Sequence, residues 1–360
     1  MRAIVAAEAG IGREHAGSLA QQAGAPTCNR SASVNTASIV SIITQPALRD
    51  GHHTANRKHL AEAELSAGCE MLRLIEQTTL LKAATTYMDL LRDGALLELM
   101  RRNFVVLQEL MRQSRDRFDT GAVTLSEVAQ VESDITMGRA RVARAEAQYA
   151  RSKVTYLQVI GFEGRTLAPA APVERLMPRR LPEAIDVGRA RHPDVGVARL
   201  AAHAAALRLK INEGSLHQGA AEDPLIREAT ATVAQKQKDL DAAHDIVRTN
   251  VVAAWDRLDA AKTRILAAQS HVAATEIALN NLRQQARVDR GMTPDVLNAQ
   301  QELVDARVAL VTAQHDRVVA SYALLAAVGE LNMHKLGIKL SLYDPTIHYQ
   351  HDPLVHYRGR

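Results

Sequence analysis

Proline placement constrains this chain more than any other single feature. None occurs between Pro46 and Pro169, and only Pro294 falls between Pro224 and Pro345. Proline inside a helix removes a hydrogen bond and clashes with the preceding turn. Two stretches of more than a hundred residues that almost wholly avoid it are therefore free to form very long helices.

Apolar residues in the first stretch recur every three or four positions, which indicates helix. A period near 3.5 sustained over this length predicts a coiled-coil seam rather than a compact bundle. A helix over 53–118 would be roughly 100 Å long at 1.5 Å per residue. Aromatic residues make up only 3% of the chain, too few to seed several compact cores. The seam before residue 120 includes Leu90, Leu97, Phe104 and Met111, and the seam after it includes Val128, Val131, Ile135 and Val142.

A turn separates these two seams. Gly121 suits the residue after a helix end, where a positive φ is needed. Thr124, followed three residues later by Glu127, forms the capping-box pattern of a new helix. The sequence therefore predicts two long antiparallel helices joined by a tight tip.

The second stretch repeats the first at one constant offset, which takes Gly161 to Gly329. The match needs no gap over about 75 residues, so we interpret it as a second copy of the hairpin. In the second tip Asp289 takes the place of Gly121, and Gly291 follows two residues later. Thr293 is expected to cap the next helix, with Pro294 in its first turn. Other matching pairs include Leu90 and Leu258, Leu97 and Ile265, and Val128 and Val296.

Charge and motif content exclude several classes of function. The net charge is +4 with basic and acidic residues interleaved, which favours solvated helix faces over a nucleic-acid surface. The sequence has no run of 18 apolar residues that would predict a transmembrane helix. At the N-terminus, Glu8 interrupts the apolar residues before they are long enough for the core of a signal peptide. We find no catalytic or nucleotide-binding motif. We therefore expect no enzyme, no catalytic residue, no cofactor and no metal site.

Several segments resemble one family in order, spacing and duplication. They are 87–93 and 117–124 in the first copy, 295–303 and 322–329 in the second, and the tail 342–345. Together these segments resemble the TolC family of outer-membrane efflux and secretion channels. The tail resembles the type I secretion branch.

This resemblance implies a homotrimer that combines a β-barrel in the outer membrane with a helical tunnel across the periplasm. The hairpin tips would meet a periplasmic adaptor (membrane fusion protein), which connects to an inner-membrane ABC or proton-driven pump. The pump would drive transport, and the channel would supply a passive path. The expected location is the outer membrane, with a periplasmic helical domain.

The expected fold class is mainly α: two tandem long antiparallel hairpins with at most a remnant of the β-barrel. Residues 38–46 have the pattern of one strand, but 215–223 are too short for two membrane strands of ~9–11 residues each. We therefore expect most of the barrel and the signal peptide to be missing, as in a truncated member.

The expected layout is 1–35 irregular, 36–50 remnant strand, 51–164 first hairpin (tip near 119–124), 165–193 proline-rich linker, 194–224 short helix and truncated barrel connection, 225–330 second hairpin (tip near 289–294), and 331–360 tail.

Two groups of residues near the tips are candidate sites. Exposed tips with aromatic and arginine side chains favour protein docking, although Phe118 could also simply close the seam. Charged residues near both tips could form gating contacts, or could be a solvated face, since surface ion pairs contribute only about 0–1 kcal/mol. The candidate docking residues are Arg117, Phe118, Gly121, Thr124, Asp289, Gly291 and Thr293, and the candidate gating residues are Asp116, Asp119, Arg283 and Arg287.

Two other classes of protein remain as alternatives. A soluble α-helical coiled-coil scaffold with no transport role would be a monomer or dimer, whereas the channel would be a trimer. A periplasmic adaptor also contains long hairpins, but it would need a lipoyl-like β-domain beside one hairpin, and the sequence has no such pattern.

Overall fold

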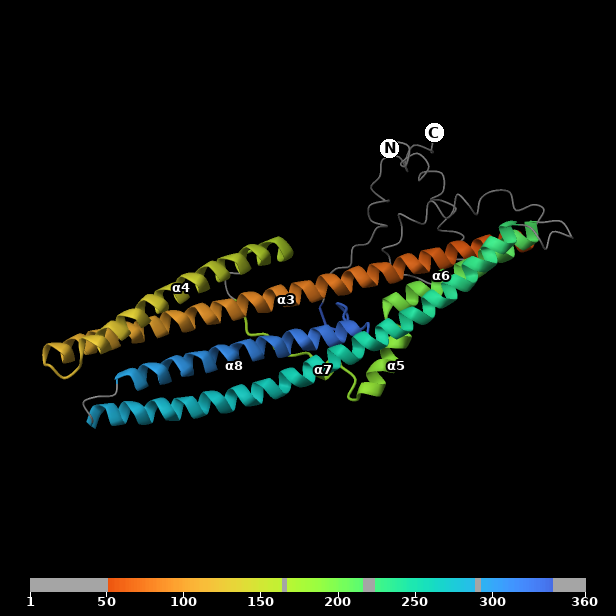
Figure 1. Ribbon diagram of the computed structural model, residues 1–360. Coiled ribbons are helices and arrows are strands. Elements are labelled where there is room, and N and C mark those ends of the chain that lie inside the picture. The colour runs from red at the N-terminus through yellow and green to blue at the C-terminus, as the bar shows by residue number, and fades with distance from the viewer. Residues whose placement is uncertain (1–50, 164–166, 216–223, 289–292, 339–360) are drawn as a thin grey trace, which may run out of the picture. The chain divides into compact units, whose positions relative to one another are not determined.

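The computed structural model describes residues 51–163, 167–215, 224–288 and 293–338. Within these ranges the chain is mainly helical and contains no strand. The mainly-α class with two tandem long hairpins is confirmed (Figure 1). The helices are α3 (Gly51–Asp119), α4 (Leu125–Ile160), α5 (Leu181–Arg191), α6 (Pro193–Ser215), α7 (Pro224–Val288) and α8 (Thr293–Ala327), with a short 3₁₀ turn η1 (Glu174–Leu176).

The helix bounds repeat at the offset found in the sequence. Moving α4 by that offset gives 293–328, and α8 spans Thr293–Ala327. Gly161 and Gly329, which correspond to each other in the repeat, both have positive φ, at 89° and 75°. The same backbone device therefore ends the return helix of both hairpins.

The chain divides into two compact units. The first comprises Met1–Thr78, Pro178–Val251 and Ala327–Arg360. In its described part, α3 packs on α6 through Ala63, Ala204 and Leu207. The Glu76 carboxylate accepts a hydrogen bond from the backbone N–H of Met333, 2.8 Å away, which ties the segment after α8 to α3.

The second unit comprises Thr79–Met177 and Val252–Ala326, which hold α4, nearly all of α8 and the parts of α3 and α7 nearer the tips. Leu107 and Met111 of α3 pack against Val128 and Val131 of α4 and reach Leu297 of α8. Further buried residues, including Leu279 of α7 with Val296 and Leu303 of α8, close the second hairpin. In Figure 1, α4 runs back along the distal half of α3, and α8 runs back along α7.

The first tip has the predicted chemistry. The backbone N–H of Gly121 donates to Phe118, and that of Ala122 donates to Arg117, which is the Schellman pattern of a helix end. Gly121 has φ 70°. The Thr124 side chain accepts from the Glu127 backbone, and the Glu127 carboxylate accepts from the Thr124 backbone, so the predicted capping box is confirmed.

The linker before α5 is held against the hairpins of the second unit. The Tyr87 hydroxyl donates to the carbonyl of Ala168 at 2.6 Å. The backbone N–H of Val173 donates to the buried Ser321 hydroxyl at 3.1 Å. Arg317 of α8 donates to Glu174 at 2.8 Å. These bonds fix an extended, proline-rich segment that has few backbone partners of its own.

Some expectations fall outside the described residues. These are the irregular start at 1–35, the strand at 36–50, the connection at 216–223, the second tip at 289–292, and the tail beyond residue 338. Among the described helices, none is both long and apolar enough to cross a membrane.

Candidate functional site

The first tip places its predicted docking residues on or near the surface. Phe118 is 40% exposed. Gly121 lies in the turn, and Thr124 caps α4. Arg117 is partly buried and lines a groove beside the tip. The four residues therefore lie together at the tip of the first hairpin, where a partner protein could reach them.

The groove beside this tip has a volume of about 540 Å³. Val105, Leu110 and Val296 supply apolar walls, while Arg117 and Arg283 supply charge. The groove thus brings one predicted docking residue, Arg117, together with one predicted gating residue, Arg283. The Ser114 hydroxyl, which also lines it, is buried without a hydrogen-bond partner in the described part of the chain.

The second tip is only partly described. Asp289 and Gly291 lie outside the described residues. Arg287 lies in the last turn of α7, and Thr293 begins α8, but the placement of their side chains is not described. Their docking and gating roles stay predictions.

The candidate gating residues make contacts other than pairs between the two tips. Asp116 accepts from Arg112 of the same helix at 2.8 Å. Arg283 of α7 donates to the Gln300 side chain of α8 at 2.9 Å. Gln300 in turn donates to Asn103 of α3 at 3.0 Å, and both amide side chains belong to buried residues. A chain of polar contacts from Arg283 through Gln300 to Asn103 therefore connects the two hairpins.

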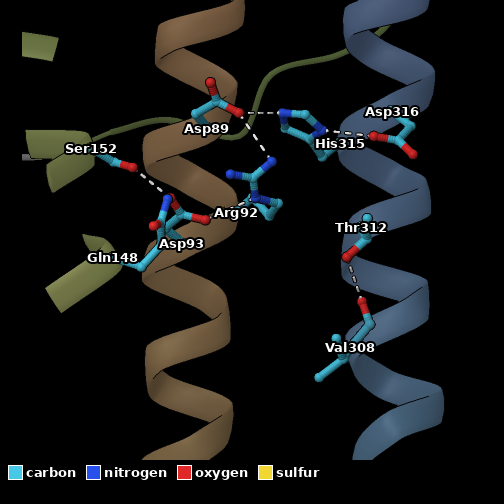
Figure 2. A network of polar contacts seen from close by, with 9 residues as sticks. All are labelled: Asp89, Arg92, Asp93, Gln148, Ser152, Val308, Thr312, His315 and Asp316. Carbon is cyan, nitrogen blue, oxygen red and sulfur yellow. Dashed lines mark hydrogen bonds and ion pairs between the residues drawn. The ribbon is translucent and has the colours of Figure 1, made fainter. Parts of the chain in front are cut away.

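A second polar network lies farther from the tips and joins three helices (Figure 2). His315 of α8 contacts Asp89 of α3 through Nε2 at 2.9 Å and its neighbour Asp316 through Nδ1 at 3.0 Å. Arg92 lies 3.1 Å from Asp89 and donates to Asp93 at 2.8 Å. Asp93 then accepts from two residues of α4, Gln148 and Ser152.

Asp93 is the most deeply buried member of this network, at 2% exposure. Burial alone would raise the pKa of its carboxyl group. The hydrogen bonds from Arg92, Ser152 and Gln148 outweigh burial and hold the pKa below its ordinary value. Asp93 is therefore ionised in the folded protein at neutral pH.

The sequence reasoning missed both polar networks, although a signal for them exists. Asp93 lies seven residues before Met100 and fourteen before Leu107, in a heptad row that places it beside apolar residues of the seam. His315 likewise lies seven residues after Val308 and seven before Tyr322. A polar residue in such a row predicts a buried contact between helices.

The polar side chains of the described residues mostly contact one another. Among them, no group of three or more His, Cys, Asp or Glu residues is arranged to hold a metal ion. The polar groups described above hydrogen-bond to one another between helices. Such an arrangement connects and orients helices.

Comparisons with known proteins agree with this architecture. The chain is 31% identical over 352 residues to the outer membrane efflux protein BepC of Brucella suis biovar 1 (strain 1330), covering 88% of this chain and 77% of that protein. No family model matches the chain.

Solved structures show the same fold at low identity. CusC matches with a TM-score of 0.68 and 15% identity, over 77% of this chain and 74% of that one. VceC from Vibrio cholerae matches with a TM-score of 0.66 and 17% identity, over 77% and 76%. The Campylobacter jejuni CmeC outer membrane channel matches with a TM-score of 0.67 and 10% identity, over 86% and 77%.

Two tandem helical hairpins of this length, with polar contacts between them, have the fold of the outer-membrane channels that the chain resembles. The chain belongs to the TolC family of outer-membrane efflux channels. Its place is accordingly the outer membrane, with the helical hairpins in the periplasm.

Proposed function

We propose that this protein is the outer-membrane subunit of a tripartite efflux or type I secretion system. It supplies a passive path for a substrate that an inner-membrane ABC or proton-driven pump moves. The observation that carries this proposal is the 31% identity to an efflux protein over 88% of the chain. The repeated helix bounds support it, because a two-copy hairpin gives each subunit two segments of a tunnel wall.

The working form is a homotrimer. Several large apolar side chains are exposed on the hairpins, among them Val105 at 63%, Met137 at 56% and Ile277 at 62%. Exposed apolar surface of this kind favours association, and closed symmetric rings are its usual outcome. A neighbouring copy would cover these side chains.

The hairpin tips are the docking site for a periplasmic adaptor. Phe118 and Arg117 are the kinds of side chain that anchor protein interfaces. The adjacent groove of about 540 Å³ has apolar walls that could take part of a partner helix. In the second tip, Asp289, Gly291 and Thr293 are proposed for the same role.

Gating involves the charged residues near the tips. Asp116 and Asp119 on the first hairpin, and Arg283 and Arg287 on the second, change partners when the channel opens. In the described state Asp116 is bound to Arg112 and Arg283 to Gln300, so each has a contact to give up.

An efflux assay tests the proposal. In a strain that lacks the gene for this protein, expression of the protein should lower the accumulation of ethidium. The double variant Arg117→Ala/Phe118→Ala should abolish this effect. It should also abolish cross-linking of the protein to the adaptor. Arg102→Ala is the matched control, because Arg102 is exposed and pairs only with Glu98 one turn away among the described residues.

The same strains separate the two kinds of system. A type I secretion channel would leave ethidium accumulation unchanged and restore a protein to the culture medium. If neither readout depends on the protein, the proposal is wrong, and a scaffold without a transport role becomes the better account.

A further inference from the structure

The groove beside the first tip has the size and the walls of a small-molecule site. Leu110, Ser114 and Arg117 are four and three residues apart on α3, which places them on one face of the helix. The other walls come from α7 and α8 and include Arg283 and Val296. The volume of about 540 Å³ falls within the range of ligand pockets, ~300–1,000 Å³, which combine apolar walls with a few polar groups.

Positive charge is in excess in this groove. Arg283 donates to the amide oxygen of Gln300, which is neutral. Arg117 is partly buried, and within the described part of the chain its guanidinium group forms no ion pair. Glu109 also lines the groove, but its carboxylate is already bound by Arg112 at 2.8 Å. Since charges removed from water are normally paired, the groove is complementary to an anion.

The Ser114 hydroxyl is a polar group in the same groove that lacks a partner. Ser114 is 2% exposed, and its oxygen makes no hydrogen bond within the described ranges. Other helical hydroxyls, such as those of Thr85 and Thr136, donate to the carbonyl oxygen four residues earlier. A buried polar group without a partner is unfavourable. An acceptor oxygen of a ligand would satisfy it.

The repeat shows that the hairpin fold does not require these polar side chains. In the second copy, Leu282 and Gln285 occupy the positions equivalent to Ser114 and Arg117. Leu282 packs against the core cluster of its hairpin. An apolar side chain therefore serves the hairpin at the position of Ser114, and the serine and the arginine distinguish the first copy from the second.

We propose that this groove binds a small organic anion in which a carboxylate or sulfonate group is joined to an apolar ring system. The acid group lies beside Arg117 and Arg283 and accepts a hydrogen bond from Ser114, and charge-assisted hydrogen bonds of this kind are the strong ones. The rings lie along Leu110 and Val296. A partner helix of the kind proposed above would contact the same apolar walls, so it would compete with the anion.

A titration of the purified full chain with dansyl acid tests the proposal. Dansyl acid is a naphthalene sulfonate whose fluorescence rises when it leaves water, and the signal from detergent alone is subtracted. One saturable site per chain is expected. Dansyl amide has the same rings but no charge, and it should bind at least about tenfold more weakly.

Three variants make the test specific. Arg117→Gln/Arg283→Gln should weaken the binding of dansyl acid at least about tenfold and leave that of dansyl amide unchanged. Ser114→Ala should weaken dansyl acid about threefold, and it decides the matter if circular dichroism shows that the double variant has lost helix. Arg102→Gln/Arg115→Gln is the matched control, because it removes the same charge from exposed positions outside the groove. It should bind as the wild type does.

The proposal is overturned if dansyl acid shows no saturable binding, or if dansyl amide binds as tightly as the acid. Unchanged binding in Ser114→Ala and in the arginine double variant would also overturn it, since the dye would then be on exposed apolar surface elsewhere. An equal loss in the control variant would show that only net charge matters. Because the titration needs no adaptor, pump or transport, its failure is distinguishable from a failure of the efflux assay.

Discussion

Replacing Asp93 by asparagine should destabilise the protein by about 2 kcal/mol, the size expected for a hydrogen bond to a charged group. The carboxylate accepts from Arg92 at 2.8 Å, from Gln148 at 3.1 Å and from Ser152. An amide has one acceptor oxygen, so its NH₂ group must face one of these donors. Hydrogen bonds to a charged group contribute about 1.5–3 kcal/mol. The Arg92 side chain is 22% exposed, and partial screening by solvent places the loss toward the lower half of that range.

Thermal unfolding measured by circular dichroism gives the readout. For a chain of 360 residues, about 2 kcal/mol corresponds to a fall in Tm of about 2–3 °C. Asp256→Asn is the matched control, because Asp256 is exposed on α7. An exposed substitution of this kind should change stability by less than about 0.5 kcal/mol.

The pH dependence of the stability difference between wild type and Asp93→Asn is a sharper test. Burial acts to raise the pKa of Asp93, but its hydrogen bonds outweigh burial and lower it from 3.8. A carboxylate with a lowered pKa stabilises the fold above its unfolded pKa, and this contribution is lost as pH falls through the folded pKa. The gap between wild type and Asp93→Asn should therefore be full at pH 7 and pH 5 and shrink below about pH 4. A gap that is absent at pH 7, or that persists unchanged in acid, would refute this reasoning.

Three further predictions concern the fold and are read by thermal unfolding. Gly329→Ala should lower the free energy of unfolding by more than about 3 kcal/mol, because φ is +75° and the new Cβ would lie 2.5 Å from the Cα of His192. Gly161→Ala should lower it by only about 1–2 kcal/mol, because φ is +89° but the new Cβ would meet open space. Equal losses in the two variants would contradict this account. Thr124→Ala should cost about 1 kcal/mol by removing the capping box, and a neutral result would mean that the cap does not matter at this tip. Leu279→Ala should cost about 2–5 kcal/mol, since Leu279 is 2% exposed in the core of the second hairpin; a loss below about 1 kcal/mol would show that this core is loosely packed.

The helices and the first tip could be predicted because their signals are local. Gly121 and the Thr124–Glu127 pair act through backbone geometry within a few residues, and the structure has both as expected. The repeat was also readable, since a constant offset aligns one copy with the other without knowledge of their packing.

Contacts between helices could not be predicted in the same way. Whether Asp116 meets Arg283 or Arg112 depends on how each helix is rotated about its axis, which a single seam does not determine. In the structure Asp116 turns toward Arg112 of its own helix. The contacts of His315 with Asp89 and of Asp93 with Gln148 join residues that lie far apart in sequence on different helices, so the charge pattern alone did not reveal them.

The mass of the protein extracted from cells tests the central claim most directly. Native mass spectrometry on the detergent-extracted outer-membrane fraction should give a trimer of about 118 kDa, three times the 39.2 kDa of one chain. A monomer or dimer recovered wholly from the soluble fraction would contradict the assignment to an outer-membrane efflux channel.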